Sequence, residues 1–372
     1  MRVIPDRESS NSGGAKVNNK MWFLVGAIIA CLIASAVLPV PQVGAQKTIT
    51  IVDSAGREVE IPQPLERIAV HYPNLLEVII ALDAEETVIG VADSVAAGQD
   101  KILQRFSGKP GIGVGAGPRA SVNIEKLTEL NPQVLLVMSG ASRLEKELEP
   151  LGIQVVELSC NELDTLAQEI ALLGKMLGRE KEAQQYVAFF QTYLELVDQR
   201  LRDVKEEEKP RVYLEFFSDY TTQGRGSPGD MVVSRAGGNN VAAILRLPFP
   251  AVNSEWVVRQ NPDVIIRAQL PMFAPSGYMV TDPSAMDKLR GEIMERPEWK
   301  GKEMKAVETS RVYVINSDLW TSPRVPLGAL YTAKCLYPDR FQDVDPDEVH
   351  REWLRKFYGL EEGGIWFWPE LE

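Results

Sequence analysis

The chain has 372 residues, of which 45% are hydrophobic and 25% are charged, and its net charge is −12. A chain with this charge and no long basic run would repel a phosphate backbone, which argues against nucleic-acid binding. Two His and three Cys residues are too few for the usual zinc sites, whose ligands occur in closely spaced pairs. The length and composition predict about two globular domains.

The N-terminus carries the pattern of an export segment. Residues 21–38 are uncharged and apolar, with Lys16 and Lys20 before them and Val43-Gly44-Ala45 after them. This order is typical of a secretory signal. We therefore expect residues 1–45 to be a signal peptide and the protein to be exported, to the periplasm or the outer face of the cytoplasmic membrane. Two alternatives stay open, an uncleaved membrane anchor and lipidation at Cys31.

Short strands and helices alternate after the export segment. Residues 48–53 and 58–61 are predicted to form a hairpin across a Ser-Ala-Gly-Arg turn. Further strands are expected at residues 67–70, 87–91, 133–138 and 154–158, and helices at residues 74–82, 124–130 and 143–148. Continuously apolar strands separated by helices indicate a parallel sheet that is covered on both faces.

A long helical stretch divides this region from a second one of the same kind. Residues 163–208 contain no proline and two glycines, Gly174 and Gly178, and a break is expected near Gly178. Strands are then predicted at residues 211–216, 263–268 and 311–315, and helices at residues 230–236, 255–260, 326–336 and 347–358. We predict two Rossmann-like α/β lobes with parallel central sheets, residues 46–161 and 210–372, joined by a single long helix within residues 162–209.

An internal repeat links the two lobes. Residues 122–137 read VNIEKLTELNPQVLLV and residues 252–267 read VNSEWVVRQNPDVIIR. Each copy reads as a loop, a helix that opens with Asn-x-Glu, an Asn-Pro stop and a buried strand. Glu125 and Glu255 occupy the same place in the first helical turn, where a carboxylate gains about 0.3 to 1 kcal/mol from the helix dipole. Helix capping alone would therefore explain both residues.

Several stretches together resemble a known family. They are ITIVDSAGREVEIPQPLERIAV, NLLEVIIALDAEETVIGVAD, the Asn-x-Glu and Asn-Pro pattern of both lobes, RAGGNNVA at residues 235–242, and RVYVIN followed by LYPDRF. Residues 47–360 are similar to the class III periplasmic binding proteins of ABC importers for ferric siderophores, haem and cobalamin. The resemblance implies a monomeric binding protein and not an enzyme, with a metal chelate as ligand, a ferric siderophore first and a corrinoid or haem as alternatives. It also implies that Glu125 and Glu255 dock onto Arg residues of the two permease subunits.

Ligand contacts are predicted from geometry. In open parallel sheets ligands lie beyond the carboxyl ends of strands, and in two-lobed proteins they lie between the lobes. Arginine binds anionic groups in a bidentate way, and aromatic rings stack on planar ligand parts. The predicted ligand-binding residues follow strands, or lie in the glycine-rich loop before Glu125, and are Tyr72, Arg119, Tyr220, Arg225, Arg267, Tyr278, Trp320 and Arg324, with His71 as an addition.

Other patterns receive simpler interpretations. Cys160 and Cys335 are expected to be buried, unpaired thiols. The methionines at positions 272, 279 and 286 are expected to fill gaps or make flexible surface contacts, without a metal or cofactor of the protein's own. The alternative function is an enzyme on the same scaffold, such as a chelatase. Such an enzyme would need a histidine beside a carboxylate in the cleft, and His71 is the one histidine that could take this place.

Overall fold

The computed structural model describes residues 47–98 and 100–371. The predicted export segment lies outside this range. The described chain opens with an antiparallel hairpin of β1 (Thr48–Val52) and β2 (Glu58–Pro62), in which Ile51 pairs with Val59. Both of these side chains are buried while their neighbours along the strands are exposed or partly exposed. The alternation therefore forms the expected one-sided hairpin.

The first lobe is built around a four-stranded parallel sheet in the order β4-β3-β7-β8. Its strands are β3 (Ile68–Val70), β4 (Val88–Val91), β7 (Val134–Val137) and β8 (Gln154–Glu157), its helices are α2 (Pro73–Ala81), α3 (Asp93–Ala96), α4 (Ile124–Leu130) and α5 (Arg143–Leu148), and β5 (Gly113–Val114) pairs with β6 (Ser121–Val122). Along β7, Val134 and Leu136 face one hydrophobic core, and Leu135 and Val137 face another. The prediction of a parallel sheet covered on both faces is confirmed.

The second lobe repeats this plan on a six-stranded sheet in the order β10-β9-β12-β14-β16, with β11 also on β9. Three central strands are parallel, and two edge strands are antiparallel. Its strands are β9 (Arg211–Phe216), β10 (Ser218–Thr222), β11 (Asn239–Asn240), β12 (Val264–Gln269), β14 (Val312–Asn316) and β16 (Phe367–Trp368), and a separate ladder joins β13 (Gly277–Tyr278) to β15 (Gly364–Ile365). Its helices are α8 (Pro228–Arg235), α9 (Ser254–Gln260), α10 (Ser284–Met294), α11 (Lys305–Glu308), α12 (Asp318–Thr321), α13 (Val325–Leu336) and α14 (Pro346–Tyr358).

Short 3-10 helices join several of these elements. They are η1 (Glu85–Thr87), η2 (Gln104–Phe106), η3 (Gly117–Arg119), η4 (Glu149–Leu151), η5 (Glu206–Glu208), η6 (Pro297–Trp299) and η7 (Pro338–Arg340). Within the described residues, no helix combines the length and the apolar character needed to cross a membrane.

The helical stretch between the sheets consists of two helices, α6 (Leu166–Leu177) and α7 (Glu180–Leu201). They separate at Gly178, whose left-handed backbone (φ +66°) ends α6, as the sequence indicated. The two helices pack closely, because a Cβ atom on Gly174 would lie 2.6 Å from the Cβ of Ala183. Helix α7 has 22 residues, about 33 Å at 1.5 Å per residue, and leads into the second lobe. The predicted single helix is thus a helix pair, of which α7 makes the connection.

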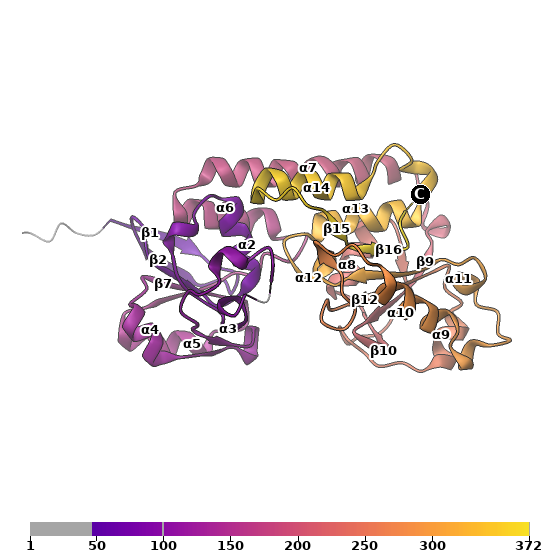
Figure 1. Cartoon of the computed structure of the whole chain (residues 1–372), viewed down its shortest axis with the longest axis horizontal. Helices are drawn as coiled ribbons and strands as arrows, with labels where there is room; N and C mark the ends of the chain where they lie inside the picture. The colour runs from indigo at the N-terminus through magenta and orange to yellow at the C-terminus, as the bar shows by residue number, and fades with distance from the viewer. Residues whose placement is uncertain (1–46, 99, 372) are drawn as a thin grey trace, which may run out of the picture. The chain divides into compact units, whose positions relative to one another are not determined.

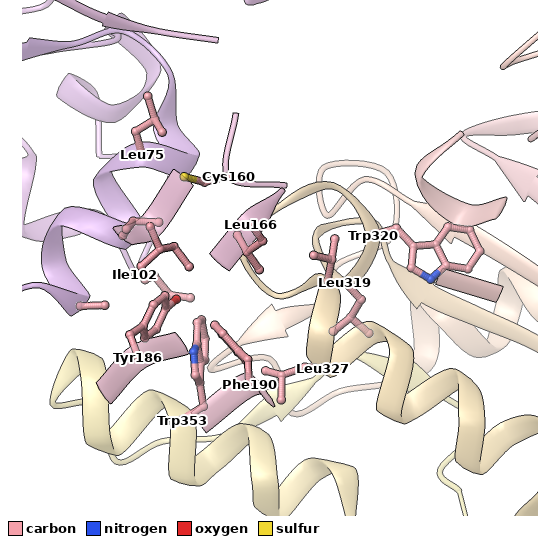
Figure 2. Close-up of a cluster of buried hydrophobic side chains, with 14 of the residues drawn as sticks. Leu75, Ile102, Cys160, Leu166, Tyr186, Phe190, Leu319, Trp320, Leu327 and Trp353 are labelled. Carbon is pink, nitrogen blue, oxygen red and sulfur yellow. The ribbon is translucent and has the colours of Figure 1, made fainter. Parts of the chain in front are cut away.

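A shared hydrophobic core joins the lobes in addition to this connection. It includes side chains from helix α2 of the first lobe, from α7, and from α13 and α14 of the second lobe. Figure 2 shows Tyr186, Phe190 and Trp353 close together, and the ring of Phe190 lies 4.8 Å from that of Tyr186 and 6.2 Å from that of Trp353. Helix α14 runs beside α7 (Figure 1), with Phe357 5.4 Å from Phe189. Helix α2 of the first lobe also packs on α14 in this core, so relative motion of the lobes would disturb close-packed side chains.

Candidate ligand-binding cleft and docking helices

A cavity of about 710 Å³ lies between side chains of the two lobes. Its size falls within the range of about 300 to 1,000 Å³ that is usual for small-molecule sites. The first lobe contributes Pro73, Ser94, Val95 and residues 100–103, and the second lobe contributes residues 270–272, 275–278, Val280, Asn316, Asp318, Arg324 and Trp366. Pro73, Leu270 and Asn316 lie at or just after the carboxyl ends of β3, β12 and β14. The cleft is thus placed as expected for a ligand site of parallel sheets.

Arg324 contacts acidic side chains from both lobes. Its side chain is 1% exposed, and its Nη2 atom lies 3.0 Å from Oε2 of Glu77 in helix α2. Its Nη1 atom lies 3.4 Å from Oδ2 of Asp318 at the start of α12. The guanidinium also lies 5.5 and 5.0 Å from the ring centres of Trp353 and Trp366. An anionic ligand would have to compete with Asp318 and Glu77 for the donors of this cation.

Glu77 is an unusual residue for the place where two lobes meet. It is 3% exposed, and burial raises the pKa of its carboxyl to about 8, against the opposing effect of Arg324. A carboxyl in so apolar a setting is costly to ionise. The interlobe contact between Glu77 and Arg324 is therefore sensitive to pH near neutrality.

Much of the cleft wall is apolar or aromatic. Tyr278 lies in β13, which is paired to β15, and Trp366 follows β15 directly. The ring of Trp366 stacks on His350 at 4.2 Å. Burial, with Arg324 and Arg351 nearby, lowers the pKa of His350 well below its usual range, so this ring is a neutral support. This wall suits apolar or aromatic surface on a ligand.

Of the predicted ligand-binding residues, Tyr278 and Arg324 lie in the cleft lining. Tyr72 precedes Pro73 of the lining, and its hydroxyl accepts hydrogen bonds from Nδ2 of Asn74 at 2.7 Å and of Asn161 at 3.3 Å. Trp320 is 0% exposed and belongs to the shared hydrophobic core, as Figure 2 shows. Tyr72 therefore borders the cleft, and Trp320 is a buried core residue that does not line it.

Arg267 and Tyr220 belong to a buried charge network inside the second lobe. Arg267 is 3% exposed and donates through Nη1 to Glu215 at 2.7 Å. Glu215 also accepts two hydrogen bonds from Arg296, at 2.7 and 2.8 Å. The guanidinium of Arg296 lies 4.7 Å from the ring centre of Tyr220, and Asp219 contacts both arginines. These side chains stabilise one another and do not line the cleft.

The remaining predicted residues also lie outside the cleft lining. Arg119 is exposed at the end of η3, and Arg225 is exposed with its Nε donating to the carbonyl of Ala243 at 3.1 Å. His71 is 0% exposed, and its Nε2 donates to the carbonyl of Ser121 at 3.3 Å. Burial lowers the pKa of His71, which favours the neutral ring. The chelatase alternative thus has no accessible histidine at this position.

The sequence interpretation missed a large part of the cleft wall. Residues 100–103 and 270–272, Asn316 and Trp366 line the cleft although they were not predicted to bind the ligand. Leu270 and Asn316 could have been found, because they satisfy the same rule of position after a strand. Trp366 lies beyond the last predicted helix in a stretch without helical or strand periodicity, so no local pattern pointed to it.

The repeated segments form two helices with nearly identical ends. Asn123 caps α4 by accepting from the backbone N–H of Lys126 at 2.9 Å. Asn253 caps α9 by accepting from the backbone N–H of Trp256 at 2.8 Å. Each helix ends at a left-handed asparagine, Asn131 (φ 46°) or Asn261 (φ 41°). The structural equivalence predicted from the repeat is confirmed for these helices.

Glu125 and Glu255 are exposed in the first turns of these helices. Arg259 lies 3.9 Å from Glu255, but both side chains are mostly exposed, at 65% and 83%, and such surface pairs contribute little. Lys126 pairs with Glu129 at 2.6 Å. Within residues 47–371, Figure 1 shows α4 and α9 on the side away from α7 and α14. Both carboxylates are therefore accessible to a partner.

A family model described as periplasmic binding protein matches residues 68–319. The chain belongs to this family. Periplasmic binding proteins are the extracytoplasmic solute-binding components of ABC transporters, and they work with a permease and are not enzymes. The prediction of family and of general function is confirmed to this extent, while the ligand is not identified by family membership.

Individual periplasmic binding proteins extend the comparison. The chain is 27% identical over 362 residues to the molybdate-binding protein MolA of Haemophilus influenzae, covering 90% of this chain and 96% of MolA. It is 28% identical over 213 residues to the vitamin B12-binding protein of Salmonella typhi, covering 56% and 70% of the two chains. The crystal structure of the TroA-like periplasmic binding protein FepB from Veillonella parvula superposes with a TM-score of 0.73 at 23% identity, covering 87% of this chain and all 100% of FepB. The two-lobed α/β fold is thereby confirmed.

Proposed function

We propose that this periplasmic binding protein captures a metal chelate in the cleft between its lobes and delivers it to an ABC permease. A ferric siderophore is the ligand that we propose first, with cobalamin or haem as alternatives. The observation that carries the proposal is the cleft of about 710 Å³ with its largely apolar wall. A ligand that fills a cleft of this volume gains most of its contacts from apolar side chains, and a few polar groups of the site fix its orientation.

The charges in the cleft favour a chelate over a bare oxyanion. Among the described lining residues, the basic side chains are Lys101 and Arg324, and the acidic ones are Asp100 and Asp318. Arg324 already contacts Asp318 and Glu77, and these contacts take up hydrogen-bond donors of its guanidinium. A small oxyanion depends on charge-assisted hydrogen bonds from uncompensated donors. A large chelate can gain affinity from apolar contact instead.

We further propose that Glu125 and Glu255 dock onto the two permease subunits. The proposal is supported by the matched positions of these residues in the capped helices α4 and α9 and by their exposure. Paired carboxylates on equivalent helices suit a partner made of two similar subunits, each of which would present basic residues. The docking role is compatible with stabilisation of the helix ends by the same carboxylates.

Ligand titrations test the proposed ligand class. The purified protein is titrated with a ferric catecholate siderophore, a ferric hydroxamate siderophore, cyanocobalamin, haemin and sodium molybdate, and binding is followed by isothermal calorimetry. We expect at least one chelate to bind with a Kd of about 1 μM or lower, equivalent to about 8 kcal/mol, and molybdate to produce no saturable heat. Saturable binding of molybdate without binding of any chelate would reject the proposal.

A further inference from the structure

The second lobe presents large apolar side chains to solvent at the edge of the cleft. Met272 and Phe273 are 77% and 68% exposed, and Met279 is 49% exposed. Met272 lines the cleft, and Phe273 and Met279 adjoin lining residues in the sequence. Apolar side chains grouped at the rim of a groove often mark a contact surface, because leaving them in water is unfavourable. We call Met272 and Phe273 the apolar lip.

The apolar lip stands on an anchored base. The backbone N–H groups of Phe273 and Ala274 donate to the carbonyl of Leu270 at 3.0 and 3.2 Å, and Ala274 is 2% exposed. Beyond it, β13 pairs with β15, with Gly277 opposite Ile365 and Tyr278 opposite Gly364. A Cβ atom on Gly364 would lie 2.0 Å from the carbonyl oxygen of Gly277, so the close approach of these strands requires glycine. The exposure of the lip is therefore a property of its two side chains and not of a loosely held segment.

We propose that the apolar lip covers the apolar periphery of the bound chelate and determines which chelates the cleft accepts. This inference rests on the proposed function and specifies its ligand further. The ligand would carry its metal inside an aromatic or alkyl shell, as in a catecholate siderophore or a corrin ring. The flexible thioether of methionine and the flat ring of phenylalanine both adapt to such surfaces.

The position of the lip indicates that the bound ligand is what covers its two side chains. Met272 shares the cleft wall with Tyr278, and on the first lobe Val95 and Ile102 contribute further apolar surface to the same cavity. A ligand that fills the cavity therefore meets apolar side chains from both lobes. Contact of the lip with a ligand would remove Met272 and Phe273 from water without any new protein partner.

The same lobe supplies a matched control. Ile244 and Leu247 are 69% and 65% exposed, similar to the lip, but neither of them, nor a direct neighbour of either in the sequence, lines the cleft. Replacing either pair by serine removes a comparable amount of exposed apolar surface. A difference between the two double variants therefore reports position relative to the cleft, and not a general effect of lower surface hydrophobicity.

The test compares Met272→Ser, Phe273→Ser with Ile244→Ser, Leu247→Ser in the full chain. The probes are the gallium(III) complex of a catecholate siderophore, cyanocobalamin and sodium molybdate. For the chelate that wild type binds, we expect the lip variant to lose at least about 10-fold in affinity, equivalent to about 1.4 kcal/mol. The control should stay within about 2-fold of wild type, as is usual for surface substitutions. Melting temperatures of both variants should match wild type, because all four side chains are exposed.

Methionine oxidation gives a second readout that needs no substitution. An exposed methionine is oxidised to its sulfoxide by peroxide, and mass spectrometry measures the rate at each site. A saturating redox-inert chelate, the gallium complex or cyanocobalamin, should slow oxidation of Met272 several-fold. An unchanged rate at Met272 in the saturated complex would contradict contact between the lip and the ligand.

The outcomes separate the lip from the proposed function. If wild type binds no chelate, the proposed function fails and the lip inference fails with it. If wild type binds a chelate and the lip variant binds it equally well, the lip inference alone is overturned. Loss of permease-dependent uptake by a lip variant with normal chelate affinity would assign the lip to the permease instead, and this result also overturns the inference.

Discussion

The contact between Glu77 and Arg324 makes a specific prediction about pH and stability. Glu77 is 3% exposed, and burial raises its pKa from 4.5 to about 8. The folded protein therefore holds this proton more tightly than the unfolded chain does. The stabilisation is complete below about pH 4.5 and is lost as the pH rises through about 8. The substitution Glu77→Gln keeps the shape of the side chain and removes its ionisation.

The magnitude follows from the pKa difference. Each pKa unit corresponds to about 1.4 kcal/mol, so ionising Glu77 in the folded protein costs on the order of a few kcal/mol above pH 8. Glutamine avoids this cost, and the raised pKa already includes the attraction of the ionised carboxylate to Arg324. We expect Glu77→Gln to be within about 1 kcal/mol of wild type at pH 5 and more stable than wild type by about 4 kcal/mol at pH 8.5.

Urea unfolding at pH 5, 7 and 8.5, followed by tryptophan fluorescence, measures these differences. The exposed Glu125→Gln variant is the control and should change the free energy of unfolding by at most about 1 kcal/mol at each pH. The reasoning would be refuted if Glu77→Gln were less stable than wild type by about 3 to 5 kcal/mol at pH 8.5, the usual cost of breaking a buried ion pair. In that case the attraction to Arg324 would outweigh burial.

Three further predictions concern docking, motion and the buried charges. The double variant Glu125→Arg, Glu255→Arg should bind ligand like wild type but lose permease-dependent uptake, because like charges would face the permease; wild-type uptake would reject docking. Small-angle scattering should show a radius of gyration near 20 Å. Ligand binding should lower this radius by less than about 1.5 Å, because the shared core resists hinge closure. A larger fall would contradict a rigid connection between the lobes. Glu215→Ala leaves Arg267 and Arg296 without their common carboxylate and should lower the free energy of unfolding by about 3 to 5 kcal/mol in urea, whereas a loss below about 1 kcal/mol would count against the network.

The sequence predicted the central strands because they are buried on two faces, and it predicted helix α4 because Asn123 and Asn131 mark its two ends. Helix α4, helix α5 and strand β9 have the predicted bounds. Helix α10 was not predicted, since it has Gly291 in its interior and only Met286 and Ile293 are buried. Its stability comes from packing on the sheet, which a local pattern does not express. Strand β16 is a two-residue edge whose pairing with β14 joins distant parts of the chain.

Site residues could be predicted from the sequence where their place depends only on following a strand. They could not be predicted where their contacts depend on which residues face each other on neighbouring strands. Arg267 lies near the end of β12, as predicted, but Glu215 stands directly opposite on β9. The guanidinium of Arg267 therefore donates to Glu215 and not to a ligand. This contact can be predicted only when the order and register of the strands are known. Trp366 reaches the cleft because the chain returns to the second sheet after α14, a long-range arrangement without a local signal.

The most direct test of the account is identification of the ligand that the protein retains when it is purified from its native cell envelope. Native mass spectrometry gives the ligand mass, elemental analysis gives the metal, and the absorption spectrum distinguishes a ferric catecholate, a corrinoid and haem. We predict one organic chelate per protein chain, containing iron or cobalt. Stoichiometric molybdenum without an organic component would contradict the claim that the cleft between the lobes binds a metal chelate.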